Sequence, residues 1–133
     1  MRMALTFAAI VMPAILDAAL DTERFLMAIS AVESGHNDYA VNPRSQASSR
    51  YQITRTVWRQ WQPKTPFSMC RGELAHSVAT RHVEWLAAHI GTDPAALAAA
   101  WRWGLRGSQR DAWNSDYPIR VRNLYHALAR RET

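Results

Sequence analysis

The sequence predicts an all-α fold, and three observations support this prediction. Apolar residues recur at helical spacing in several segments, whereas the alternation typical of strands is nearly absent. Most of these segments begin with a good N-cap residue and end at Gly or Pro. At 133 residues, the chain is long enough for one hydrophobic core and too short for two ordinary domains. We therefore expect about five or six short helices in one domain.

The first 20 residues allow two interpretations. Residues 3–16 form a mostly apolar run behind a short basic start, which is the layout of a secretory signal peptide. The thin basic start, Pro13 and Asp17 weaken this interpretation, and the equally weighted alternative is a first helix packed on the domain. Either way the run is too short to span a membrane, so no stable membrane insertion is expected. We assign residues 1–20 to this segment and residues 21–133 to the folded domain.

The first clear helix of the domain begins at Asp21 or Thr22, and either residue is a good N-cap. It ends at Gly35, which suits a left-handed position after a helix, and it carries Glu33 in its last turn. Residues 36–51 follow as a polar stretch rich in Asn and Ser. This composition predicts a long ordered loop or a short irregular hairpin, and loops of such length usually carry function.

Four more helices are predicted after the loop. They begin after Thr54, at residue 73, after Asp93 with Pro94 in the first helical position, and at Asp116 or Tyr117 ahead of Pro118. The first three end at the prolines of residues 63–66, at Gly91, and at Gly104 or Gly107. The third of them is rich in Ala, which implies close packing against its neighbours.

Charge and cysteine content limit the function classes. The formal net charge is +5, and Lys64 is the only Lys, so nearly every cation is Arg. Nucleic acid, an anionic membrane face and the acidic bacterial wall would all be attracted, and charge alone does not choose between them. Cys70 is the single cysteine, which excludes an internal disulfide and a thiolate cluster.

Glu33 is the residue that we expect to carry chemistry. It stands four residues after Ile29 and seven after Leu26, so its carboxyl group projects along a mostly apolar side of the helix. Burial and the negative end of the helix dipole both raise the pKa of a carboxyl group there. A carboxylic acid that stays protonated near neutral pH can donate a proton to a glycosidic oxygen. The alternative is a helix-end carboxylate that reaches solvent or pairs with an Arg such as Arg50.

Two other clusters are interpreted as structural. His76, His82 and His89 lie on one predicted helix but lack the spacing of a metal site, so packing histidines are favoured and no metal is expected. Residues 101–106 combine two Trp with two Arg and could stack nucleic-acid bases. In an Ala-rich helix this pattern more often means a core with a solvated Arg face, so no nucleic-acid partner is expected.

Three segments resemble the lytic transglycosylase family of the lysozyme-like superfamily. They are AISAVESGHNDYAVNPRSQASSRYQIT at residues 28–54, AAAWRWGL at residues 98–105 and DYPIRVRNLY at residues 116–125. Their order and spacing agree with the family over roughly the last 110 residues. The resemblance implies a lysozyme-like helical domain with a long active-site loop after the catalytic helix. It also implies cleavage of the β-1,4 bond between N-acetylmuramic acid and N-acetylglucosamine in peptidoglycan, without a cofactor.

The resemblance assigns roles to seven residues. It implies that Glu33 is the catalytic acid and base and that the hydroxyl group of Tyr117 contacts and orients its carboxyl group. It implies substrate binding by five further residues: Ser34, Ser48, Tyr51, Gln52 and Trp101. A monomer acting on glycan strands in the periplasm or outside the cell is expected, and the location depends on whether the first residues are a signal peptide.

Two short segments depart from the family's pattern. Ser48, Ser49 and Arg50 stand where the family commonly has glycines, and Arg102 with Trp103 replaces an Asn ahead of the later Gly. These departures put the geometry of the turn and one binding contact in doubt, and loss of activity is conceivable. A non-catalytic wall-binding module on the same fold is therefore the alternative, and a basic helical nucleic-acid binder is a third.

The implied mechanism uses one carboxyl group. Substrate-assisted glycosidases let the N-acetyl oxygen of the sugar attack the anomeric carbon, so they need no second carboxylate. Asp38 is the nearest second candidate, but backbone capping explains its position as well. After acid catalysis, Glu33 would act as a base toward either the muramoyl 6-hydroxyl group or water. The first route gives an anhydro sugar and the second gives hydrolysis, and the sequence does not distinguish them.

Overall fold

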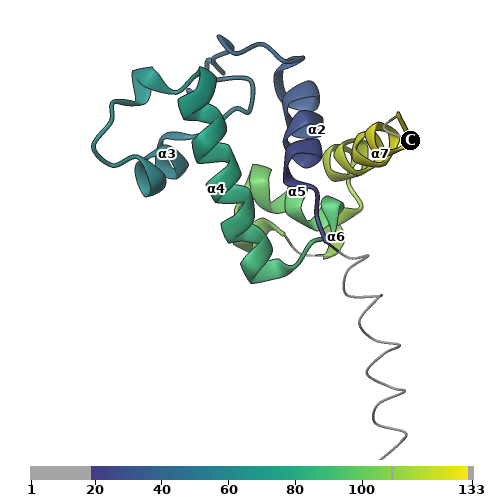
Figure 1. The fold of residues 1–133 in the computed structure, drawn as a ribbon. Coiled ribbons are helices and arrows are strands. Elements are labelled where there is room, and N and C mark those ends of the chain that lie inside the picture. The colour runs from purple at the N-terminus through teal and green to yellow at the C-terminus, as the bar shows by residue number, and fades with distance from the viewer. Residues whose placement is uncertain (1–18, 109, 132–133) are drawn as a thin grey trace, which may run out of the picture.

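The computed structural model describes residues 19–108 and 110–131, and this part of the chain is helical without strands. The predicted all-α class is confirmed. The elements are α2 (Thr22–Ser34), α3 (Arg55–Trp61), the 3₁₀ helix η1 (Phe67–Met69), α4 (Gly72–Ile90), α5 (Pro94–Trp103), the 3₁₀ helix η2 (Leu105–Gly107), α6 (Arg110–Trp113) and α7 (Asp116–Arg131) (Figure 1). Residues 1–18, on which the choice between signal peptide and first helix rests, lie outside the described residues.

Helix α2 has the ends that its sequence predicts. The side chain of Asp21 accepts a hydrogen bond from the backbone N–H of Arg24, which satisfies one of the free donors of the first turn. Gly35 adopts φ 61° after the last turn, and its N–H donates to the carbonyl oxygen of Ala31. The N–H of His36 donates to the carbonyl oxygen of Ser30, which completes the helix end. The position of Glu33 is therefore fixed by a well-defined terminus.

The other predicted caps are also present. Thr54 caps α3 and Asp93 caps α5, each by accepting a backbone N–H with its side chain. Gly91 and Gly104 end α4 and α5 with positive φ, as their positions in the sequence indicate. The pattern did not predict the 3₁₀ helices or the four-residue α6, because segments this short carry no periodic signal.

Helix α5 lies between α4 and α7. Helix α5 packs against α4 on one side and α7 on the other, while α2 packs against both α7 and α4 (Figure 1). Six consecutive residues of α5, from Ala95 to Ala100, are buried, and five of them are Ala. Small side chains let the neighbouring helices approach closely. This packing brings the end of α2, the end of α5 and the start of α7 together.

The polar stretch after α2 is the irregular hairpin that was one of the two predicted alternatives. Val41 pairs with Ser48, and Ser48 pairs with Ile53, each as an isolated antiparallel bridge. Four non-glycine residues of the segment from His36 to Gln52 adopt the left-handed conformation, among them Ser49 with φ 75° and Gln52 with φ 55°. The turn thus keeps a glycine-like backbone at Ser49 without a glycine. Such a conformation costs a non-glycine residue roughly 1–2 kcal/mol.

None of the helices in the described part of the chain is both long and apolar enough to cross a membrane.

Candidate active site

The site centres on a pair formed by Glu33 and Tyr117. Glu33 lies in the last turn of α2 and is half-buried, whereas Tyr117 lies in the first turn of α7 and is buried. The hydroxyl group of Tyr117 donates a hydrogen bond to Oε2 of Glu33 at 2.6 Å. The contact that the family resemblance implied is therefore present between residues far apart in the sequence. The packing of α2 against α7 creates it.

The environment of Glu33 favours its protonated form. Burial raises the pKa of Glu33 above its usual value, because the charged carboxylate loses hydration. The hydrogen bond from Tyr117 and the positive charge of Arg102 act in the opposite direction, and both effects are smaller than that of burial. The net result is a raised pKa, as the sequence predicted. The positive charge that influences the pKa of Glu33 belongs to Arg102 and not to Arg50, the candidate named from the sequence.

Tyr117 is held as a neutral hydrogen-bond donor. Burial and the neighbouring carboxyl group of Glu33 both raise the pKa of the Tyr117 hydroxyl. The guanidinium of Arg102 lies 4.6 Å from the centre of the Tyr117 ring, and the ring of Trp103 contacts the same ring edge-on at 6.0 Å between centroids. These contacts fix the ring, so the direction of its hydroxyl group toward Glu33 is set by packing.

A pocket of about 280 Å³ opens beside Glu33. Its walls come from the end of α2, the hairpin and the end of α5, and the lining residues are Glu33, Asn42, Ser45, Ala47, Gln52, Thr54, Trp101, Arg102 and Trp103. Glu33 is the one carboxylate among them. A second pocket of about 310 Å³ adjoins it, because Arg102 and Trp103 line both. We call these two adjoining pockets the groove.

Two of the predicted binding residues line the groove. Gln52 contributes from the hairpin, and its Nε2 donates to the carbonyl oxygens of Ala40 and Ser49, which ties the two arms of the hairpin together. Trp101 contributes from α5, and its Nε1 donates to the carbonyl oxygen of Tyr51 at 3.1 Å. Both side chains therefore form the wall and also hold the hairpin in place.

The other three predicted binding residues lie outside the groove. The hydroxyl group of Ser34 donates to the carbonyl oxygen of Arg50 at 2.9 Å and fastens the hairpin to the end of α2. Tyr51 is buried, and Ser48 lines a separate pocket on the hairpin with Arg55. Binding of substrate by these residues stays a prediction, while their observed contacts position the hairpin.

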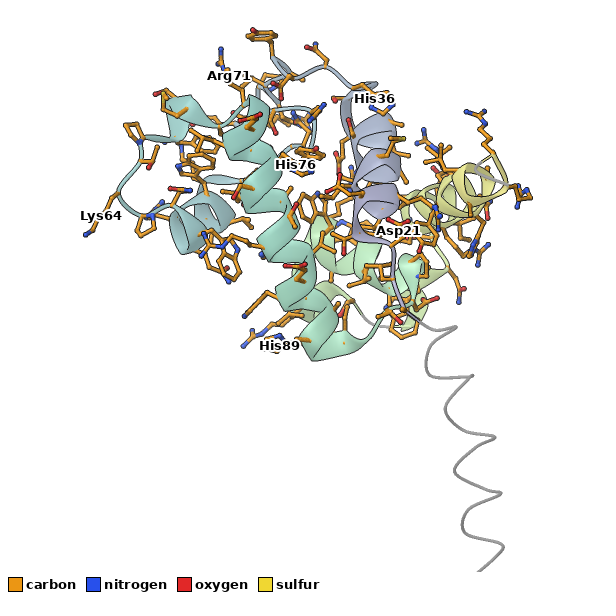
Figure 2. All side chains as sticks on the ribbon, in the orientation of Figure 1. Asp21, His36, Lys64, Arg71, His76 and His89 are labelled. Carbon is orange, nitrogen blue, oxygen red and sulfur yellow. The ribbon has the colours of Figure 1, made fainter. Side chains whose placement is uncertain are left out.

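Asp38 acts as a cap, although not within its own turn. Its Oδ2 accepts a hydrogen bond from the N–H of Gly72 at 2.6 Å, so it caps the start of α4 across the loop. Asp38 does not line the groove. It lines a larger hollow of about 560 Å³ between α2 and α4, where Figure 2 shows His76. Oδ1 of Asp38 and Nε of Arg50 are buried there without a hydrogen-bond partner.

The three histidines of α4 do not form a cluster with one another, although His82 and His89 both contact Trp85. His76 contacts Glu23 of α2, and His89 lies at the far end of α4 (Figure 2). His82 is buried, stacks on Trp85 and accepts a hydrogen bond from Nε1 of Trp61. Burial lowers the pKa of His82 to about 4. Within residues 19–108 and 110–131, no three His, Cys, Asp or Glu side chains are grouped so that they could hold a metal ion.

Arg102 and Trp103 are site residues that sequence reasoning did not assign to the active site. They were noted as a departure from the family's Asn and as part of a Trp and Arg cluster that was interpreted as structural. The available signal was their place in the segment AAAWRWGL, which had already contributed Trp101 as a predicted binding residue.

The fold and the site define an all-α protein with a half-buried carboxyl group of raised pKa, held by a tyrosine, at the edge of an open groove. Comparison of the chain with models of protein families, with curated proteins and with solved structures found no match.

Proposed function

We propose that this protein is a glycosidase that cleaves the glycan strands of peptidoglycan with Glu33 as its acid and base. The observation that carries the proposal is the half-buried carboxyl group of Glu33, which has a raised pKa, receives a hydrogen bond from Tyr117 and lines an open groove. Such a carboxyl group is suited to donate a proton to a leaving glycosidic oxygen. The resemblance of three segments to the lytic transglycosylase family supports the same reaction.

The two oxygens of the Glu33 carboxyl group have different roles in this proposal. Oε2 accepts the hydrogen bond from Tyr117. Oε1 makes no hydrogen bond to the described residues, so it is the oxygen that carries the proton toward the substrate. Once the bond breaks, the proton resides on the leaving sugar oxygen and Glu33 is ionised. The hydrogen bond from Tyr117 then stabilises the carboxylate until it removes a proton from the attacking hydroxyl group.

A substrate-assisted route fits the set of groups in the groove. Among the side chains that the structure describes, the acids that line it are Glu33 and Asp116, and Asp116 lies in the adjoining pocket with its side chain 87% exposed. An exposed carboxylate near Arg120 is poorly placed to stabilise a buried cationic centre. The N-acetyl oxygen of the sugar therefore serves as the nucleophile. The acceptor is either the muramoyl 6-hydroxyl group, which gives an anhydro sugar, or water.

The test compares the purified protein with its Glu33→Gln variant on purified peptidoglycan, with the released fragments identified by mass spectrometry. We expect soluble fragments from the unmodified protein and a rate at least about 100-fold lower from Glu33→Gln, because general acid catalysis contributes about 10²–10⁴-fold. The matched control is Glu84→Gln, which changes an exposed carboxylate of α4 away from the groove.

Each other outcome excludes a stated part of the proposal. Release of fragments that survives Glu33→Gln excludes Glu33 as the acid. Protein that sediments with wall material but releases nothing indicates the non-catalytic binding module instead. Binding to DNA or RNA that weakens steeply with salt would favour the nucleic-acid alternative.

A further inference from the structure

Arg102 lies at the junction of the two pockets that make up the groove. It lines the pocket that contains Glu33 and also the adjoining pocket with Ser115, Tyr117 and Arg120. Its guanidinium lies over one ring face of Tyr117 at 4.6 Å, so the ring holds the charged group at this position. The residue is exposed, which leaves its N–H donors accessible from the groove.

Arg102 forms no ion pair with the described side chains. No carboxylate of these residues lies within 4.0 Å of its guanidinium. Glu33 interacts with Arg102 electrostatically without forming an ion pair, and Asp116 pairs with Arg120 at 3.8 Å. Within the described residues, the groove therefore presents an accessible guanidinium beside the proposed reaction centre.

This charge is unfavourable for the chemistry of Glu33 alone. A cation near a carboxyl group favours its ionised form, and Arg102 lowers the pKa of Glu33 against the effect of burial. A neutral side chain, such as the Asn common in the resembling family, would avoid this effect. A guanidinium at this place is explained if the bound substrate brings a negative charge to it, because Arg matches a carboxylate with paired hydrogen bonds.

We propose that Arg102 binds a carboxylate of the glycan substrate at the junction of the two pockets, so that the groove selects strands with a free carboxylate close to the scissile bond. This inference rests on the proposed function. Muramic acid carries a lactyl carboxylate, which is free where the peptide stem has been removed and is an amide where the stem is attached. The peptide stem itself carries carboxylates farther from the sugar. The two sources share one chemistry, and a test can separate them.

The test measures binding with three soluble tetrasaccharides. The first alternates N-acetylglucosamine with muramic acid that has a free lactyl carboxylate, the second carries peptide stems on the same sugars, and the third contains N-acetylglucosamine only. Binding is followed by tryptophan fluorescence in the Glu33→Gln background, because Trp101 and Trp103 line the groove. Cleavage by the protein with Glu33 intact is measured in parallel.

We expect the first tetrasaccharide to bind about tenfold more tightly than the neutral one at low salt, since a charge-assisted pair at an exposed site is partly screened. Arg102→Gln should reduce this ratio to about one, and Arg102→Lys should restore part of it. Arg106→Gln removes an exposed Arg that lines neither pocket, so the ratio should persist. If the stem-bearing sugar binds best and depends on Arg102, the carboxylate comes from the stem.

Equal affinity for the neutral and carboxylate-bearing sugars would overturn the inference, as would the same loss of the ratio in Arg106→Gln. A different result is expected if the protein is not a glycosidase but Arg102 does bind the carboxylate. No tetrasaccharide is then cleaved, whereas binding of the carboxylate-bearing sugar still depends on Arg102.

Discussion

In the proposed reaction, the hydrogen bond between Glu33 and Tyr117 serves two stages. Before proton transfer, burial raises the pKa of Glu33, which favours the protonated form that the proposal requires. After proton transfer, the hydroxyl group of Tyr117, at 2.6 Å, would stabilise the carboxylate. The raised pKa of Tyr117 ensures that it donates and does not compete for the proton. Each residue therefore depends on the other for its role.

Replacing Tyr117 by Phe tests this dependence. The hydrogen bond lowers the pKa of Glu33, so its removal raises that pKa further. Activity of a general acid falls as pH rises through its pKa, and the alkaline limb of the pH–rate profile of kcat should therefore move to higher pH. We expect kcat itself to fall about tenfold because the carboxyl group loses its orientation. If the alkaline limb of the pH–rate profile does not move in Tyr117→Phe, Tyr117 does not influence the pKa of Glu33.

The control is Tyr39→Phe, which removes a hydroxyl group from an exposed ring of the hairpin that does not line the groove. Its pH–rate profile should match that of the unmodified protein.

His82 makes the stability of the fold depend on pH. In the folded protein burial lowers the pKa of His82 from 6.5 to about 4. The unfolded chain therefore binds a proton below pH 6.5 that the folded chain does not bind until about pH 4. The free energy of unfolding should fall by about 3 kcal/mol as pH decreases through this window. In His82→Gln, this contribution to the pH dependence of the free energy of unfolding should be absent.

The measurement is urea unfolding at several pH values between 4 and 7, with His126→Gln as the control because His126 is exposed on α7. A pH dependence that is identical in His82→Gln and the unmodified protein would show that other groups cause it.

At the scale of the element, the end of α2 determines where the carboxyl group of Glu33 points. Gly35 reverses the chain with φ 61°, and Ser34 anchors the hairpin through its hydrogen bond to Arg50. Gln52 and Trp101 also hold the hairpin, because their side chains donate hydrogen bonds to the carbonyl oxygens of Ala40 and Tyr51. A helix terminus and a loop are therefore joined into one wall of the groove.

Gly35→Ala should weaken both the fold and the proposed activity. Alanine in the left-handed conformation costs about 1–2 kcal/mol, although the space around Gly35 would accept the added carbon atom. Gly35→Asn should cost clearly less, since Asn tolerates this conformation. Thermal unfolding of both variants separates strain from size. Equal destabilisation by Ala and Asn would indicate a steric cause, in conflict with the open surroundings.

At the scale of the whole molecule, α5 decides how closely α4 and α7 approach it. Its buried Ala residues lie between α4 and α7, and α7 in turn carries Tyr117 to α2. A change in the thickness of α5 would shift α7 and alter the distance between Tyr117 and Glu33. The packing of the core and the geometry of the site are therefore linked.

Ala98→Leu tests this link. Ala98 is fully buried, and a larger side chain there should lower the free energy of unfolding by about 1–3 kcal/mol through overpacking. The proposed activity should fall at temperatures where the variant is still folded. Ala88→Leu on the exposed face of α4 is the control, and its stability should stay within about 0.5 kcal/mol. If Ala98→Leu loses stability but keeps its activity, the geometry of the site does not depend on the packing of the core.

The sequence by itself determined the class of the fold, the termini of the main helices and the environment of Glu33. These features depend on local rules: helical spacing, caps such as Asp21 and Thr54, and a carboxyl group on an apolar helix face. The resemblance to a family added the contact with Tyr117. Capping by Asp38 was also expected, but its partner on α4 was not.

Only the tertiary structure decided which of these residues meet. It placed Gln52 and Trp101 in the wall of the groove, left Ser34, Ser48 and Tyr51 outside it, and brought Arg102 onto the ring of Tyr117. The physical reason is that these contacts arise from the packing of α2, α5 and α7, which are distant in sequence. Local spacing fixes the face of a helix on which a side chain lies, whereas the distances between helices depend on how all of their faces fit together.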